Sequence, residues 1–171
     1  LKKNLAKIKE HYDYVIVDSS PHFSEMLPVI AACDNIFVVT TPDHVTLQTS
    51  IKAAKMAKLK KTPISGIIIN KIKNPNFELS LREIETEAGI PVVARIKDDK
   101  KMVEALFHKK PITLHSKNHH ISKEIRNFAS SLCGVEEDKG SMDFLKKFLP
   151  NKLDLEREKV NRAMLRQDFY T

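Results

Sequence analysis

Apolar residues along the chain fall into short continuous runs separated by segments with helical spacing. Four runs are predicted to be strands, at residues 12–18 (YDYVIVD), 35–41 (NIFVVTT), 64–70 (ISGIIIN) and 90–96 (IPVVARI). Continuous rather than alternating apolar runs are typical of strands that are buried on both faces of a parallel sheet. The pattern therefore predicts an α/β fold in which a parallel sheet is flanked by helices.

The segments between these runs show the spacing of amphipathic helices. Helices are predicted over about residues 1–11, 23–33, 43–60, 79–88, 98–107 and 119–132. Ser80 and Glu83 have the spacing of a capping box at the start of one helix, and Gly89 is expected to end it. Ligands of such folds bind at the carboxyl ends of the strands. The informative segments are therefore those that follow each strand, at residues 18–21, 41–43, 70–71 and 97–99.

Glycine content limits the phosphate-binding chemistry of this sequence. The 171 residues include only four glycines, at positions 66, 89, 134 and 140. Their spacing permits neither GxGxxG nor GxxxxGK, so the sequence holds no glycine-rich phosphate loop of its own. The first residue is Leu1, from which we expect that the natural sequence continues upstream.

Charge and metal-ligating residues narrow the choice of partners. The net charge of +7 favours an anionic partner such as nucleic acid or an acidic membrane, although it is equally consistent with general solubility. Cys33 and Cys133 form no CxxC motif, which gives no support to a zinc finger, a metal cluster or a redox dithiol and suggests reduced thiols in a cytoplasm. His119 and His120 are adjacent, and on a helix their side chains would point about 100° apart, which is poor geometry for one metal ion.

Five motifs occur in order along most of the chain: YDYVIVDSSP, NIFVVTTPDHVTLQTS, GIIINKIKN, EIETEAGIPVVARIKDD and MVEALFHKKPI. Over about residues 10–134 this succession resembles the C-terminal part of a MinD/ParA-type ATPase, in the deviant P-loop class. The SLREIETEAGIP segment is most similar to the MinD branch, including its archaeal members. The resemblance implies a P-loop NTPase-like fold whose phosphate loop lies upstream of these residues. We therefore expect the chain alone to bind ATP weakly and not to hydrolyse it.

The resemblance also implies roles for individual residues around ATP and Mg²⁺. Asp18 matches the acidic residue that ends the Walker-B-like strand, holds Mg²⁺ through water and helps to organise the attacking water. Ser19, Ser20 and Pro21 match the nucleotide-sensing turn that follows. For Asp18, a helix-capping or turn role is the structural alternative.

Further positions match the adenine site and the dimer face of the family. Asn70 matches the asparagine that reads the adenine edge, because its amide offers a donor and an acceptor together; a strand-end turn role is the alternative. Lys97 and Asp98 occupy the loop that flanks the adenine. Pro42 and Asp43 match the turn at the dimer face.

The sequence divides into a nucleotide-binding part (1–133), a polar linker (134–140) and a helical tail (141–171). Residues 141–150 predict an amphipathic helix with an apolar side opposite lysines, and its membrane-facing and charged residues are Met142, Phe144, Leu145, Lys146, Lys147, Phe148 and Leu149. This composition is typical of a helix in a membrane interface and resembles the membrane-targeting helix of MinD, with docking on its own domain as the alternative. Residues 152–168 predict another helix, either partner-binding or solvated, with a narrow stripe of Leu153, Val160 and Met164.

These observations favour a MinD-like ATPase. Its ATP-dependent homodimerisation would control binding to the anionic inner face of the cell membrane and so position cell division or a related process, with a protein activator as a further partner. We expect such a protein to be cytoplasmic and peripheral to the membrane. One alternative is a ParA-like ATPase that binds DNA through the basic region 109–123. Another is a non-catalytic pseudo-ATPase.

Overall fold

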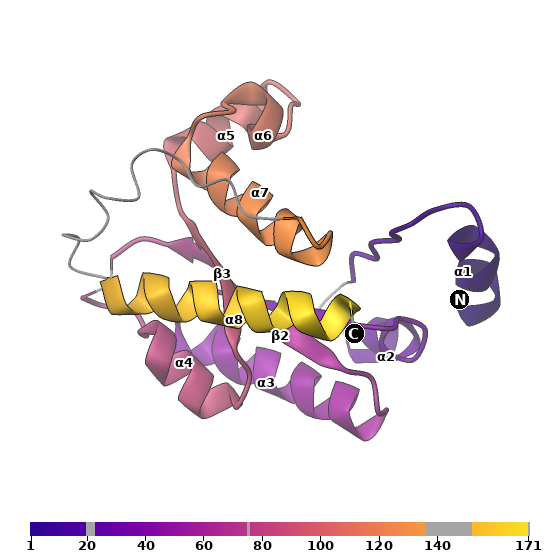
Figure 1. Cartoon of the computed structure of the whole chain (residues 1–171). Helices are drawn as coiled ribbons and strands as arrows, with labels where there is room; N and C mark the ends of the chain where they lie inside the picture. The colour runs from indigo at the N-terminus through magenta and orange to yellow at the C-terminus, as the bar shows by residue number, and fades with distance from the viewer. Residues whose placement is uncertain (20–22, 75, 136–151, 171) are drawn as a thin grey trace.

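The computed structural model describes residues 1–19, 23–74, 76–135 and 152–170. Three parallel strands form its sheet in the order β1-β2-β3, with β1 at Ile36–Thr40, β2 at Ile64–Ile72 and β3 at Val92–Lys97 (Figure 1). The predicted parallel α/β fold is therefore confirmed. The predictions for Ser20, for Pro21 and for the amphipathic helix at 141–150 lie outside the described residues.

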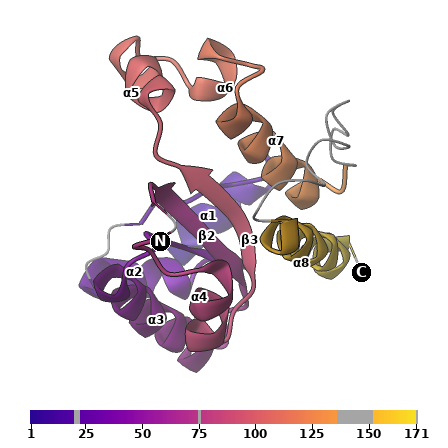
Figure 2. The same cartoon turned by 90° about the vertical axis from the view of Figure 1, so that its left-hand side faces the viewer.

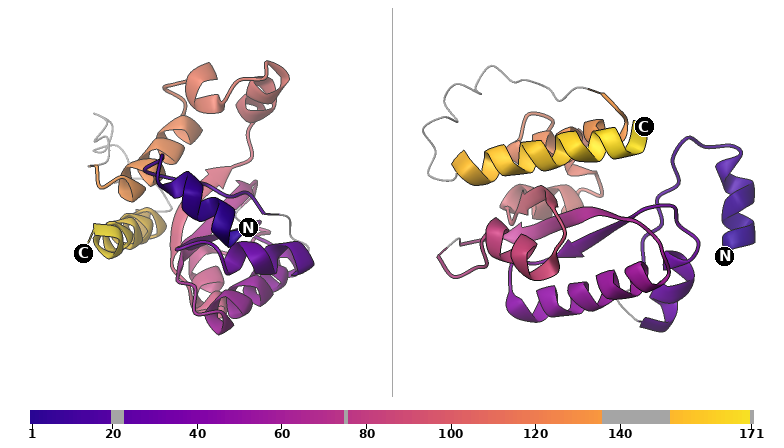
Figure 3. Two further views of the ribbon diagram at one scale, coloured as in Figure 1. Left: turned by 90° about the vertical axis from the view of Figure 1, so that its right-hand side faces the viewer. Right: turned by 60° about the horizontal axis from the view of Figure 1, so that its bottom comes forward.

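Helices cover both faces of this sheet. The helices are α1 (Lys2–Lys9), α2 (Phe23–Ile30), α3 (His44–Leu59), α4 (Leu81–Ala88), α5 (Lys100–Phe107), α6 (Ile112–His115), α7 (His120–Leu132) and α8 (Lys152–Tyr170). Helices α3 and α4 pack on one face, and α7 and α8 pack on the other (Figures 2 and 3). The short helix α6 was not predicted from the sequence pattern.

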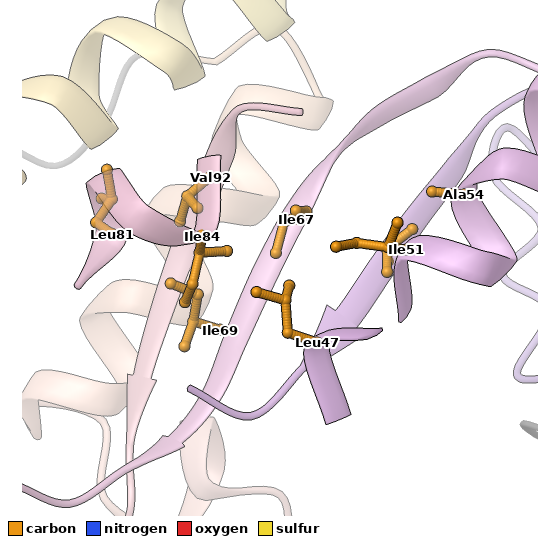
Figure 4. Close-up of a cluster of buried hydrophobic side chains, with 9 residues drawn as sticks. Leu47, Ile51, Ala54, Ile67, Ile69, Leu81, Ile84 and Val92 are labelled. Carbon is orange, nitrogen blue, oxygen red and sulfur yellow. The ribbon is translucent and has the colours of Figure 1, made fainter. Parts of the chain in front are cut away.

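The main hydrophobic core lies between the sheet and the α3–α4 layer (Figure 4). Leu47 and Ile51 of α3 meet Ile67 of β2 and Ile84 of α4, and Leu47 and Ile84 are fully buried. Each such side chain contributes roughly 1.5–3 kcal/mol through removal from water. This packing fixes the two helices against the strands and so sets the positions of the loops at the strand ends.

Local signals set the boundaries of α4. Ser80 and Glu83 form the predicted capping box, in which each side chain bonds the other residue's backbone N–H. Gly89 ends the helix in the left-handed conformation with φ 65°, which a glycine adopts without steric cost. Both predictions for this helix are confirmed.

The predicted strand at residues 12–18 is wrong. This segment is irregular in the structure, and the side chain of Ile16 is 92% exposed. Tyr14 is attached to the C-terminal end of α7, where its hydroxyl donates to the Leu132 carbonyl at 3.3 Å. An apolar run becomes a strand only where a neighbouring strand pairs with it, and among the described residues β1 pairs with β2 alone.

Helix α8 is not a solvated extension, because it packs against β3 and α7. Its role as a partner-binding helix stays a prediction. Its buried face is mainly polar and consists of Glu158, Asn161 and Arg162 beside Leu165. The predicted apolar stripe lies outside, with Leu153 80% exposed. The spacing of apolar residues did not predict the buried face of α8, because that face is held by charged residues of the sheet and of α7 and not by apolar contacts. In the part of the chain that the structure describes, no helix is long and apolar enough to cross a bilayer.

Candidate functional site

A β-bulge distorts β2 just before its carboxyl end. Ile69 pairs with Arg95 and Ile72 pairs with Lys97, so Asn70 and Lys71 together stand opposite one residue of β3. Lys71 adopts a left-handed φ of 58°, and its N–H donates to the Asn70 side-chain oxygen at 2.9 Å. Bulges of this kind redirect side chains and recur next to binding sites. The position predicted to read adenine therefore lies in an irregular stretch of the central strand.

A hollow of about 310 Å³ lies beside the carboxyl ends of β2 and β3. It is lined by Lys73, Asp98, Asp99, Lys100 and Val103. The Asp98 N–H donates to the Ile72 carbonyl at 2.9 Å, and its carboxylate lies 3.4 Å from the Lys73 ammonium. The hollow is shallow and open to solvent, and its wall combines charged groups with one apolar side chain. Such a wall can border part of a ligand, such as a base or ribose, without enclosing it.

The structure brings only some of the predicted adenine residues to this hollow. Asp98 lines it, Lys97 is the exposed last residue of β3, and Asn70 is half-buried in the adjoining bulge. Lys73, Asp99, Lys100 and Val103 were not predicted as site residues. The signal for Lys73 and Asp99 was their position shortly after a strand, whereas nothing in the spacing indicated Lys100 or Val103.

The turn after β1 is held firmly by its own residues. Asp43 caps α3 by accepting the Thr46 N–H at 2.8 Å, and the Thr41 hydroxyl also donates to this carboxylate. The Thr41 hydroxyl, followed by the Thr46 N–H, lowers the pKa of Asp43. Pro42 is buried, and its carbonyl accepts the Leu79 N–H at 3.0 Å. The role of Pro42 and Asp43 in a dimer face stays a prediction.

Asp18 and Ser19 end the irregular segment that follows α1, and both are exposed. Asp18 is not among the residues that line the hollow. An exposed carboxylate suits Mg²⁺, which keeps several waters when it binds proteins and takes few protein ligands. Asp18 thus fits the magnesium role by its chemistry, and that role stays a prediction.

Comparison with known proteins assigns the family. Residues 1–133 match the family model described as cellulose biosynthesis protein BcsQ. The chain belongs to this family. The BcsQ-family match, together with the fold, confirms the predicted relationship to the MinD/ParA ATPases.

Curated relatives of this BcsQ-family chain include ATP-binding proteins of an archaeon. Two uncharacterized ATP-binding proteins of Methanocaldococcus jannaschii are each 25% identical to it, over 130 and 154 residues. These alignments cover 75% and 87% of this chain but 49% and 58% of the relatives. The chain therefore spans about half the length of the curated relatives it matches.

Solved structures with the same fold include MinD and ParA proteins. The MinD cell division protein of Aquifex aeolicus superposes with a TM-score of 0.71 at 21% identity, over 79% of this chain and 60% of that one. A ParA family ATPase from Chlorobium tepidum gives a TM-score of 0.64 at 26% identity, over 75% and 54%. The septum site-determining protein MinD of Pyrococcus horikoshii, solved with Mg-ADP, gives 0.69 at 18% identity, over 81% and 55%.

Proposed function

We propose that this chain supplies the adenine-binding edge of a MinD-like ATP site, and that ATP-dependent dimerisation of the protein controls its association with an anionic membrane. The observation that carries the proposal is the bulge at Asn70 and Lys71 next to the hollow lined by Lys73 and Asp98. It lies at the carboxyl end of the parallel strands, where ligands of such sheets bind. The ATP-binding relatives support the same ligand.

In this proposal each residue has a distinct task. The Asn70 amide would pair with the adenine edge as donor and acceptor, and Lys97 and Asp98 would border the base. Asp18 would hold Mg²⁺ through water, and the ion would neutralise charge on the phosphates. The glycine spacing of this sequence offers no phosphate loop. Hydrolysis is therefore proposed only for a protein that also carries that loop.

Nucleotide binding to the 171-residue chain tests the adenine site. Titration with ATP and Mg²⁺, followed by amide NMR, should shift residues around the hollow with weak affinity, and ATP turnover should stay at the blank. Asn70→Ala should weaken binding by about thirtyfold, because two hydrogen bonds of about 1 kcal/mol each are lost. The matched control is Asn4→Ala, which removes an exposed asparagine from α1. Equal affinity of the Asn70→Ala and Asn4→Ala variants would contradict the proposal.

Membrane binding is tested separately with the full chain fused to a dimeric soluble reporter. Co-sedimentation with anionic but not neutral vesicles is expected, since two weak amphipathic helices gain by effective concentration. Phe148→Glu should abolish pelleting. Phe107→Glu is the control, because Phe107 is a phenylalanine 81% exposed on α5. Loss of pelleting in both variants, or in neither, would reject a membrane role for residues 141–150.

A DNA-binding role is the second candidate. Lys109, Lys110, Lys117 and Lys123 are all exposed around α6 and the start of α7. Such a group of lysines can neutralise phosphates, and the affinity would then fall steeply with salt. Salt-dependent binding to duplex DNA without vesicle pelleting would favour this function over the membrane role.

A further inference from the structure

Three metal-ligating side chains meet where the N-termini of α5 and α7 come together. The Asp99 Oδ2 atom lies 3.6 Å from Nε2 of His119 and 3.9 Å from Nε2 of His120. One ligating atom from each residue lies within 4.8 Å of the other two. In a tetrahedral zinc site with bonds of about 2.0–2.1 Å, ligand atoms are about 3.3–3.4 Å apart. The two separations from Asp99 need a contraction of only a few tenths of an ångström to reach that geometry, and the two imidazole nitrogens start no more than 4.8 Å apart.

The expectation that the two histidines diverge is wrong, and the backbone explains why. His119 is the N-cap of α7 with extended angles of φ −66° and ψ 147°, so only His120 belongs to the helix. The two rings therefore lie beside each other, with centroids 4.2 Å apart. The 100° rotation between neighbouring helical residues does not apply across a cap.

We propose that Asp99, His119 and His120 form a binding site for a divalent transition metal ion, with Zn²⁺ as the reference ion. Two imidazoles and one carboxylate are a ligand set that zinc accepts, with water completing the coordination. Mg²⁺ prefers oxygen ligands, so the site is distinct in chemistry from the magnesium role of Asp18.

Supporting contacts orient the carboxylate for this task. Asp99 caps α5, and its Oδ1 atom accepts the Lys101 N–H at 2.8 Å, which leaves Oδ2 facing the two imidazoles. The Lys101 ammonium is 2.7 Å from Glu104 and is thereby occupied by another carboxylate. Hydrogen bonds that fix a ligating group in this way are typical of metal sites.

The histidines are also prepared for metal binding. Burial, followed by the neighbouring His119, lowers the pKa of His120, which favours the neutral imidazole that binds metals. Nδ1 of His119 is buried and has no hydrogen-bond partner among the described residues. The other ring nitrogen of His119, Nε2, faces the Asp99 carboxylate.

An ion at this place would join two parts of the fold. Asp99 also lines the hollow beside β2 and β3, so the metal would connect one wall of the hollow to the start of α7. The proposal rests on this geometry alone and does not depend on nucleotide binding.

Metal titration of the full chain tests the site. Zn²⁺ and Co²⁺ are added in buffer containing excess Mg²⁺, with calorimetry for affinity and Co²⁺ visible absorption for coordination. One ion should bind per site and shift the imidazole NMR signals of His119 and His120. Asp99→Asn keeps the helix cap, because an amide oxygen can still accept the Lys101 N–H. Asp99→Asn and His120→Gln should each weaken Zn²⁺ binding by at least about tenfold. Loss of a group that only supports a metal ligand already weakens metal binding by about that factor, and these variants remove a ligand itself.

His11→Gln is the matched control, since His11 is an exposed histidine outside the site. Its affinity for Zn²⁺ should stay within about twofold of the unaltered chain, a difference well below 1 kcal/mol. Amide NMR spectra of each variant establish that the fold is retained. Zn²⁺ affinity that is unchanged in both Asp99→Asn and His120→Gln, or imidazole shifts confined to other histidines, would overturn the proposal.

Discussion

Single residues decide how closely the strands of this sheet can approach. A Cβ atom at Gly66 would lie 2.7 Å and 2.8 Å from the two methyl groups of Val93, whose side chain is fully buried. Val93 is β-branched and has little rotamer freedom with which to move away. Glycine at position 66 is therefore a packing requirement of the β2–β3 pair.

Replacement of this glycine gives a prediction at the residue scale. Gly66→Ala should lower the free energy of unfolding by about 1–3 kcal/mol, because the added methyl overpacks a filled core. Urea unfolding followed by circular dichroism measures the change. Adding Val93→Ala should recover part of the loss by making room. The control is Gly89→Ala, which is strained by its φ of 65° with nothing within 4 Å; Val93→Ala should not rescue it.

At the scale of elements, α8 is held by a network of charges. Glu158 lies between two guanidinium groups, 2.8 Å from Arg95 on β3 and 2.7 Å from Arg162 on α8 itself. Arg162 also reaches Glu124 of α7 at 2.7 Å. The Asn161 amide donates to the Val92 carbonyl at 2.8 Å. The contacts join α8 to β3 through Arg95 and Val92 and to α7 through Glu124, so the network fixes both its position and its rotation.

The charge network predicts a pH dependence of stability. Burial, and next the adjacent Glu124, raises the pKa of Glu158 to about 8. Between the ordinary carboxyl value and about 8 the folded chain holds a proton that the unfolded chain releases. The free energy of unfolding should therefore fall as pH rises from 5.5 to 8.5, by at least about 1 kcal/mol.

Urea unfolding at several pH values measures this effect. Glu158→Gln should remove most of the decline, because the amide cannot release a proton. Asp168→Asn changes an exposed carboxylate on the same helix and should keep the decline. A Glu158→Gln variant whose stability falls with pH as steeply as that of the unaltered chain would argue against a protonated Glu158.

Local signals in the sequence predicted most elements but not their partners. The strands at β1, β2 and β3 and the capping box of Ser80 and Glu83 were predicted, because a continuous apolar run and a cap are properties of neighbouring residues. The face that α8 buries was not, since Glu158 and Arg162 resemble surface residues until Arg95 and Glu124 are placed beside them. The bulge at Lys71 depends on a partner strand and was missed for the same reason.

For the whole molecule, the second face of the sheet is closed by a helix that is distant in sequence. Helix α8 follows the described part of the chain that ends at residue 135, yet it packs on β3 beside α7 (Figure 3). Residues 12–18 pair with no strand among the described residues, which explains why an equally apolar run remains irregular. The two strands that border the candidate hollow, β2 and β3, are paired with each other. Their carboxyl ends are therefore held in place.

Removal of α8 tests its place in the whole fold. A chain ending at residue 135 uncovers Arg95 and leaves Glu124 without Arg162, and loss of one partner of a buried ion pair costs about 3–5 kcal/mol. Its urea midpoint should fall markedly. A synthetic peptide of residues 152–170 should restore it in trans, whereas the same peptide with Asn161→Ala and Arg162→Ala should not. An unchanged midpoint after truncation would show that α8 adds nothing to stability.

The polar face of α8 has a consequence for what happens when that helix leaves the sheet. Glu158, Asn161 and Arg162 are groups that water hydrates well, and so are their partners Arg95 and Glu124. Separation would uncover these hydrated groups together with the side chain of Leu165. The attachment of α8 thus resembles a reversible interface between subunits, in which complementary charges determine which partner binds. A foreign helix with the same pattern of charges would compete with α8 for this site.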